Sequence, residues 1–192
     1  MADSSVPPLL PLEGAVQHYA WGGARFLPDL LGAPNPEARP WAELWLGAHP
    51  SAPARARLGD RVEPLDQLVA RNPARLLGPR AASMLGGRLP YLLKVLDARQ
   101  MLSLQVHPSR AQAVEGWARE NAAGVPLDAA HRCYRDDNHK PEVHVALTDF
   151  WMLHGFRPPE EIEEEMRRTP EIGALMPGFP ERLRCATSPE AR

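Results

Sequence analysis

Alternating apolar and polar side chains predict three β-strands in the middle of the chain. Their sequences are PYLLKVLD at residues 90–97, LSLQVH at residues 102–107 and PEVHVAL at residues 141–147. Successive side chains of a strand point to opposite faces of a sheet, so each stretch combines an apolar face with a face that carries polar groups. A further short strand is predicted at the start of WAELWLGAHPSAPA, residues 41–54, before a proline-rich loop.

Helices are predicted before, between and after these strands along the chain. Residues 64–85 predict helices that Pro73 interrupts, because proline removes a backbone donor and clashes with the preceding turn. A helix is predicted from about residue 110 to residue 122, with a capping box formed by Ser109 and Gln112. From Pro159 onwards, acidic residues precede arginines, which is the order that a helix dipole favours.

Composition narrows the class of protein. The 192 residues are 44% hydrophobic and 24% charged, as in an ordinary globular domain, and 22 of them are proline, which favours short strands and ordered loops. A net charge of −2 argues against a general nucleic-acid binder, and the apolar runs are too short to span a membrane. The N-terminal segment lacks the basic residues of a secretory signal, and Cys133 and Cys185 form no disulfide framework. We therefore expect a cytoplasmic location.

Three polar side chains on the predicted strands form a candidate metal site. Gln105 and His107 lie two residues apart and therefore share a strand face, and Glu142 opens the strand at residues 141–147. An imidazole and a carboxylate suit zinc, and a neutral amide would leave the metal more electrophilic than a second carboxylate would. The alternative interpretation is a polar strand face turned towards solvent.

The two lysines are the next candidates. Of 22 basic residues only Lys94 and Lys140 are lysine, and an arginine cannot replace an amine at every site. Lys140 lies beside His139 in NHKPE, residues 138–142, where the alternative is an exposed turn. Lys94 interrupts the apolar run PYLLKVL, where it is either an amine facing a carboxylate or anionic substrate, or a side chain that reaches solvent at a strand edge.

Four blocks together resemble the type I mannose-6-phosphate isomerases. They are VQHYAWGG, WAELWLGAHPSAP, LPYLLKVLDARQMLSLQVHPS and YRDDNHKPEVHVALT, in the order of the family and within residues 12–160. The resemblance implies a mainly β protein with helices, in which residues 12–155 are the first, incomplete part of a cupin jelly-roll catalytic domain. Residues 156–192 would begin an inserted helical region, and residues 1–11 are expected to be a flexible tail.

The resemblance also implies an activity and a set of roles. The family interconverts mannose 6-phosphate and fructose 6-phosphate through an enediol, as a cytoplasmic enzyme with one zinc per chain. Its zinc ligands would be Gln105, His107 and Glu142 here. Lys140 is the expected general base and His139 the alternative, and the expected substrate contacts are Lys94, Ser103, Glu43 and Trp21. A monomer that binds a sugar phosphate, without nucleic acid or membrane, is implied for the full-length enzyme.

Two departures from the family limit these expectations. The fourth zinc ligand of the family, a histidine, comes from a segment beyond the equivalent of residue 192, so the chain is expected to be truncated and weakly active alone. His144 stands where the family has an apolar or small residue, on the face of Glu142, and is a substitute ligand or a rim residue. The alternatives are a non-catalytic cupin that binds sugar or regulates, and an inactive fragment.

Overall fold

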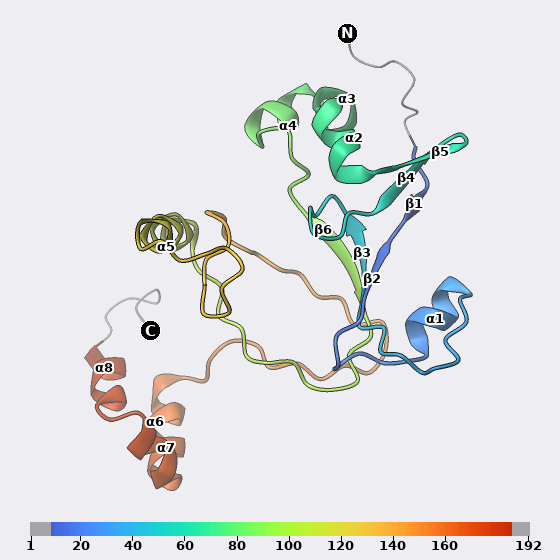
Figure 1. Ribbon diagram of the computed structural model, residues 1–192. Helices are drawn as coiled ribbons and strands as arrows, with labels where there is room; N and C mark the ends of the chain where they lie inside the picture. Colours follow the sequence, from blue (N-terminus) through green and yellow to red (C-terminus); the bar gives the residue numbers. More distant parts are fainter. Residues whose placement is uncertain (1–8, 186–192) are drawn as a thin grey trace. The chain divides into compact units, whose positions relative to one another are not determined.

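The structure is a computed structural model that describes residues 9–185 (Figure 1). The chain falls into two compact units, which divide between Lys140 and Pro141. Most of the predicted N-terminal tail, residues 1–8, and the last residues of the predicted helical region, 186–192, lie outside the described residues. The first unit contains all the strands of the described chain, and the second contains its last three helices.

The strands of the first unit form two small antiparallel sheets (Figure 1). The strand order of the first is β1-β4-β5 and that of the second is β2-β3-β6. The bounds are Leu12–Glu13 for β1, Ala15–Gln17 for β2, Glu43–Gly47 for β3, Arg55–Leu58 for β4, Arg61–Pro64 for β5 and Leu92–Leu96 for β6. The strands predicted within residues 41–54 and 90–97 are therefore confirmed as β3 and β6. The β4–β5 hairpin was not predicted, because its arginines hide the alternation.

Central strand β3 sets the register of the second sheet. It pairs with β2 on one side and with β6 on the other, so that Trp45 faces Ala15 on one neighbour and Lys94 on the other. Strand β3 is buried along most of its length, which is expected for a strand with neighbours on both sides. Strand β6 is an edge of this sheet among residues 9–185, and its outer side pairs with no other strand there.

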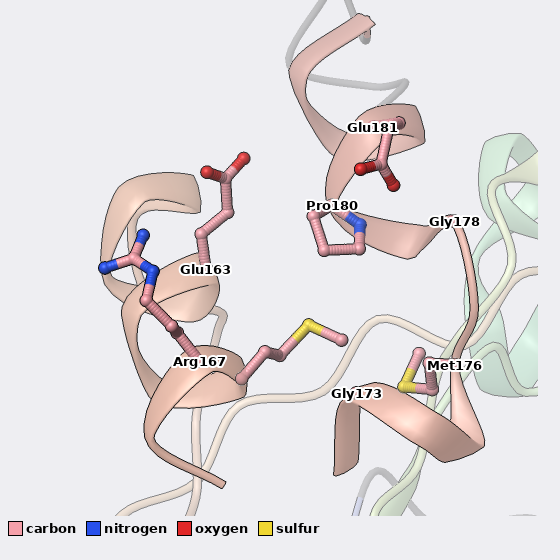
Figure 2. Close-up of a pocket in the computed structure, with 8 residues that line it drawn as sticks. Glu163, Arg167, Gly173, Met176, Gly178, Pro180 and Glu181 are labelled. Carbon is pink, nitrogen blue, oxygen red and sulfur yellow. The ribbon is translucent and has the colours of Figure 1, made fainter. Parts of the chain in front are cut away.

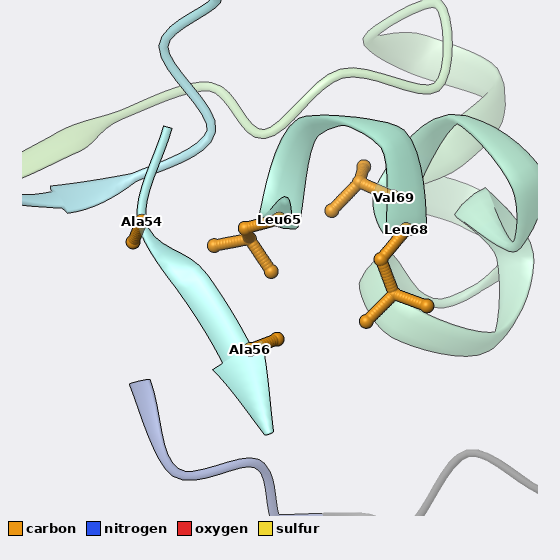
Figure 3. Packing of buried hydrophobic residues seen from close by; sticks show 5 residues of the cluster. All are labelled: Ala54, Ala56, Leu65, Leu68 and Val69. Atoms are coloured by element: carbon orange, nitrogen blue, oxygen red, sulfur yellow. The ribbon is translucent and has the colours of Figure 1, made fainter. Parts of the chain in front are cut away.

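The helices of the first unit follow the predicted punctuation. Pro73 ends one helix and begins the next, and the helices predicted within residues 64–85 are confirmed as three short ones. Helix α2 packs on the first sheet through a small apolar core, in which Leu65, Leu68 and Val69 meet Ala54 and Ala56 (Figure 3). The bounds are Phe26–Leu31 for α1, Leu65–Arg71 for α2, Pro73–Leu77 for α3, Pro79–Met84 for α4 and Arg110–Ala122 for α5.

Helix α5 has the ends that its sequence predicts. The Ser109 hydroxyl accepts the backbone N–H of Gln112, and the Gln112 side chain accepts the backbone N–H of Ser109. This reciprocal pair satisfies two donors that a helix start otherwise leaves open. Gly124, with φ of 69°, reverses the chain after the helix, in a left-handed conformation that glycine adopts without a steric penalty.

The strands predicted at residues 102–107 and 141–147 are wrong for this structure. Both stretches lack regular secondary structure, and the apolar face of each is open, with Leu104 at 79%, Val106 at 83% and Val143 at 91% exposure. Alternation makes a strand possible, but the strand forms only where a neighbour takes its backbone hydrogen bonds and covers its apolar face. Neither sheet of the described chain supplies that neighbour.

The second unit is helical after residue 158. The helix predicted from Pro159 is confirmed as α6, Pro159–Arg168, with its acidic residues in the first turn and its arginines in the last. Two short helices that the weak periodicity of this region does not predict follow it, α7, Pro170–Leu175, and α8, Phe179–Cys185. Within residues 9–185, no helix has the length and the apolar content needed to cross a membrane.

Candidate functional site

A buried carboxylate organises the centre of the second sheet. Glu43 opens β3 with 7% of its surface exposed, and its Oε2 accepts a hydrogen bond from the Lys94 ammonium at 3.0 Å. Lys94 comes from β6, and 25% of its side chain remains exposed. Burying an unpaired charge is costly, so each of these groups makes the burial of the other tolerable. Of the two interpretations of Lys94, the structure supports the amine that faces a carboxylate.

Trp45 completes this arrangement. It lies two residues after Glu43 and therefore on the same face of β3, and its indole N–H donates to Glu43 Oε2 at 2.5 Å. The Lys94 nitrogen lies 4.8 Å from the centre of the Trp45 ring, within the range of a cation–π contact. His49 packs edge-on against the same ring, with 4.9 Å between the ring centres. Trp45 was not predicted as a site residue, because it reads as an ordinary core residue of a strand.

An aromatic pair lies near this carboxylate at the turn after β2. Tyr19 and Trp21 stack with their ring centres 5.7 Å apart. Partial burial raises the pKa of the Tyr19 hydroxyl, and the negative charge of Glu43 raises it further. The Arg99 N–H donates to the Trp21 carbonyl oxygen at 3.0 Å, which places this pair beside the chain that leaves β6, the strand of Lys94. The predicted site residues Trp21, Glu43 and Lys94 therefore belong to one region of the first unit.

A second charged cluster fixes the loop that follows α5. The Arg132 side chain is buried to 1% exposure, and it donates to the backbone oxygens of Val125 and Tyr134 and to Asn121 Oδ1. Its guanidinium also lies 4.7 Å from the centre of the Trp117 ring. The planar fork of arginine suits such a set of fixed acceptors. Arg132 thereby ties residues 125–134 to the helix.

Glu120 holds the same loop from the helix side. Its carboxylate accepts the backbone N–H groups of Tyr134 at 2.9 Å and Cys133 at 3.1 Å, with Arg132 Nε 3.7 Å away. The hydrogen bond from the Tyr134 N–H is the main cause of a lowered pKa for Glu120, with smaller contributions from the Cys133 N–H and from nearby arginines. Together, Arg132 and Glu120 fix the chain a few residues before His139 and Lys140.

The predicted metal ligands lie on irregular, exposed segments. Ser103, Gln105 and His107 belong to the stretch before α5 in the first unit. Glu142 opens the second unit, and its carboxylate lies 3.6 Å from His144 Nε2. Among residues 9–185, no group of three or more histidine, cysteine, aspartate or glutamate side chains is placed to hold a metal ion. The convergence of Gln105, His107 and Glu142 on one ion stays a prediction, as does the base role of Lys140 or His139, both of which are exposed.

A cleft of about 350 Å³ lies in the second unit, among the three helices α6, α7 and α8 (Figure 2). Figure 2 shows Met176 and Pro180 at its edges, with the charged side chains of Glu163, Arg167 and Glu181 around it. None of the predicted site residues lines this cleft. The residues that line it include no histidine and no lysine, the side-chain types of the predicted base.

Comparison with known proteins decides the family. Residues 9–159 match the family described as phosphomannose isomerase type I, catalytic domain. The chain belongs to this family. A mannose-6-phosphate isomerase of Escherichia coli is 47% identical over 153 residues, which cover 79% of this chain and 39% of that protein. The human mannose-6-phosphate isomerase is 38% identical over 182 residues, which cover 90% of this chain and 40% of that protein.

Solved structures of phosphomannose isomerases have the same fold as the matched part of this chain. The mannose 6-phosphate isomerase of Salmonella typhimurium, bound to fructose 6-phosphate and zinc, aligns with a TM-score of 0.64 at 45% identity and covers 70% of this chain. A zinc-bound mannose 6-phosphate isomerase aligns with a TM-score of 0.63 at 45% identity. The chain covers about a third of each of these proteins, 34% and 33%. The prediction of a mainly β protein with helices is therefore confirmed in part: the described residues form small sheets with helices, but more of these residues lie in helices than in strands.

Proposed function

We propose that this chain carries the catalytic segment of an isomerase that interconverts mannose 6-phosphate and fructose 6-phosphate at a zinc site. The main support is its 47% identity over 153 residues to a mannose-6-phosphate isomerase. The family match over residues 9–159 adds to this, because that range contains every predicted site residue. The chain spans about two fifths of the length of this relative, 39%. The proposal therefore concerns the contribution of these residues to the whole enzyme, which we expect to be cytoplasmic and monomeric.

The donor chemistry of the predicted ligands fits zinc. An amide oxygen from Gln105, an imidazole nitrogen from His107 and a carboxylate from Glu142 make three protein ligands, which is typical of catalytic zinc sites with an open position. The His144 imidazole lies within 3.6 Å of the Glu142 carboxylate and offers a further nitrogen on the same segment. When bound, zinc polarises the substrate carbonyl and stabilises the negative charge that develops on its oxygen.

The other residues would bind the sugar and move its proton. Aldose–ketose isomerisation transfers a proton between C2 and C1 through an enediol, and this needs one side chain that takes the proton and returns it. Lys140 is the proposed base and His139 the alternative. Both follow a loop that Arg132 and Glu120 fix to α5. Lys94, Ser103, Glu43 and Trp21 would contact the hydroxyl and phosphate groups of the sugar.

The finer description of the fold is part of the proposal. We propose that residues 12–155 form the first segment of a cupin jelly roll, and that residues 156–192 begin a helical region inserted into it. The two antiparallel sheets of the first unit and the helices from Pro159 support this division. Residues 102–107 and 141–147 would then pair with strands of the remaining jelly roll, which would also cover their exposed apolar faces.

A chimera tests the function at the level of the whole enzyme. Residues 9–159 of this chain would replace the matching segment of the Escherichia coli relative, and mannose 6-phosphate turnover and zinc content would be measured together. We expect turnover with about one zinc per chimera. Gln105→Ala, His107→Ala and Glu142→Ala should each lose both zinc and turnover. Lys140→Ala should lose turnover and keep zinc.

A control variant and two alternative outcomes make the chimera experiment decisive. His131→Ala removes an exposed histidine that has no proposed role, and it should change neither zinc content nor turnover. A chimera that folds and keeps zinc but binds sugar without turnover would favour the non-catalytic cupin. A chimera with full turnover after His107→Ala would contradict the ligand set.

A further inference from the structure

The indole of Trp45 contacts both members of the Glu43–Lys94 pair. Its N–H donates to Glu43 Oε2 at 2.5 Å, and its ring lies under the Lys94 nitrogen at 4.8 Å. Trp45 is 8% exposed, and His49 packs against the edge of its ring. His49 in turn accepts the backbone N–H of Ser51 at 3.2 Å through Nδ1. Trp45 is therefore a fixed surface against which a flexible lysine can be held.

A lysine side chain needs such a surface to hold one position. Its four-carbon stem has many rotamers, and its ammonium is a point charge with three donors and no preferred plane. Here Glu43 takes one of these donors, and the Trp45 ring covers one side of the ammonium. The Glu43 carboxylate is fixed in its turn, because the Trp45 N–H occupies the same oxygen that Lys94 contacts. Removing the indole would free both charged groups.

We propose that Trp45 is a positioning residue that fixes the Lys94 ammonium for substrate. The inference rests on the proposed function, in which Lys94 contacts the sugar phosphate. Because Glu43 already compensates its charge, the Lys94 ammonium is best suited to a sugar hydroxyl oxygen, with the phosphate held elsewhere. A side chain that is still 25% exposed keeps the remaining donors open for that contact.

The lysine content of the chain makes the test direct. Only Lys94 and Lys140 are lysine, so competitive labelling of amines on the folded 192-residue chain reports on Lys94 with Lys140 as an internal standard. After labelling, cleavage after arginine puts the two lysines on separate peptides, which mass spectrometry then quantifies. In the unchanged chain we expect Lys94 to react more slowly than the exposed Lys140. Trp45→Phe keeps a ring but removes the N–H, and should raise the Lys94 to Lys140 ratio by about fivefold, the effect of one lost hydrogen bond.

Further variants separate positioning from general stability. Trp45→Leu removes the ring as well and should raise the ratio by about tenfold. Trp151→Phe, at a tryptophan that is 87% exposed, should leave the ratio unchanged. Circular dichroism and thermal melting would check that Trp45→Phe is folded. If a folded Trp45→Phe chain keeps the original ratio, the proposal is wrong. If that variant unfolds, folded Trp45→Met, which has neither a ring nor an N–H or O–H donor, takes its place. A raised ratio in Trp45→Met then supports the proposal, and an unchanged ratio contradicts it.

Labelling with zinc and mannose 6-phosphate then separates the two proposals. This labelling uses the chimera with the Escherichia coli relative, because the proposed function concerns the whole enzyme. In the chimera, substrate should slow Lys94 labelling at least twofold, and in its Trp45→Phe variant this protection should weaken. If the chimera turns over mannose 6-phosphate but substrate does not protect Lys94, Lys94 does not contact this substrate and the proposed function loses that contact. The role of Trp45 in holding Lys94 is still decided by the labelling ratio without substrate.

Discussion

Strand β6 and the stretch at residues 102–107 have the same alternating pattern and different structures. In β6, each residue from Leu92 to Leu96 faces a residue of β3, and Lys94 finds its carboxylate there. Residues 102–107 have no such neighbour among the described residues and remain irregular, with Leu104 and Val106 in solvent. This contrast shows that alternation determines which side chains share a face, whereas a hydrogen-bonded neighbouring strand determines whether the strand forms.

The largest expected difference between the two regions is in the free energy of unfolding. Leu44→Ala, in β3 at 5% exposure, should lower it by about 2–5 kcal/mol because it leaves a cavity. Leu104→Ala makes the same chemical change at 79% exposure and should shift it by less than about 0.5 kcal/mol. Urea unfolding followed by circular dichroism measures both. Similar losses for the two variants would mean that residues 102–107 are packed.

The loop after α5 is the third case, an irregular segment that is fixed without being a strand. Gly116 lets α5 approach the ring of Tyr134, and a Cβ at this position would overlap that ring. Gly116→Ala should therefore destabilise the protein by about 1–3 kcal/mol. Gly173→Ala is the matched control in α7, because its Cβ would meet its nearest atom at an ordinary 3.6 Å. A stable Gly116→Ala protein with an unchanged Tyr134 environment would argue against the fixed loop.

A smaller effect is expected in how the stability of the protein depends on pH, because the loop after α5 is held by the Glu120 carboxylate. The pKa of Glu120 is lowered in the folded chain, mainly by the Tyr134 N–H, so its stabilising contribution is complete above the usual glutamate pKa and is lost as pH falls through the lowered value. Glu120→Gln should therefore be less stable than the unchanged chain at neutral pH. The difference should shrink below about pH 4.3, the ordinary glutamate pKa.

Glu115→Gln provides the control for this pH effect. Glu115 lies on the same helix with 79% of its side chain exposed, and its carboxylate is 3.9 Å from Arg119. Surface pairs of this kind contribute little, so its unfolding curve should follow that of the unchanged chain at each pH. A stability difference between Glu120→Gln and the unchanged chain that does not depend on pH would mean that the charge of the Glu120 carboxylate does not stabilise the loop.

The sequence predicted those parts of the fold whose signal is local. Ser109 and Gln112 predicted the start of α5, Pro73 predicted the break between α2 and α3, and the order of charges after Pro159 predicted α6. Each signal concerns neighbours along the chain, and each is confirmed. Residues 102–107 and 141–147 depended on a pairing partner far along the chain, which alternation cannot supply, and there the prediction was wrong.

The candidate site shows the same division. Lys94 was conspicuous because the chain has only two lysines and this one interrupts an apolar strand. Its carboxylate partner Glu43 was predicted as a site residue through the resemblance. Trp45 and Arg132 were missed, because a tryptophan in a strand is typical of the core and one arginine of 20 is typical of the surface. Their contacts depend on register and on loop packing, which become visible only in three dimensions.

Hydrogen exchange of backbone amides tests the central claim most directly. This claim is that Glu43 and Lys94 belong to the sheet β2-β3-β6, whereas the segments of the predicted metal ligands form no strand within residues 9–185. Exchange would be followed by NMR on the 192-residue chain. We expect slow exchange for amides of β3 and β6 whose hydrogen bonds lie within the sheet. For residues 102–107 and 141–147 we expect exchange rates close to those of an unfolded peptide. Protection at residues 102–107 equal to that of β6 would contradict it.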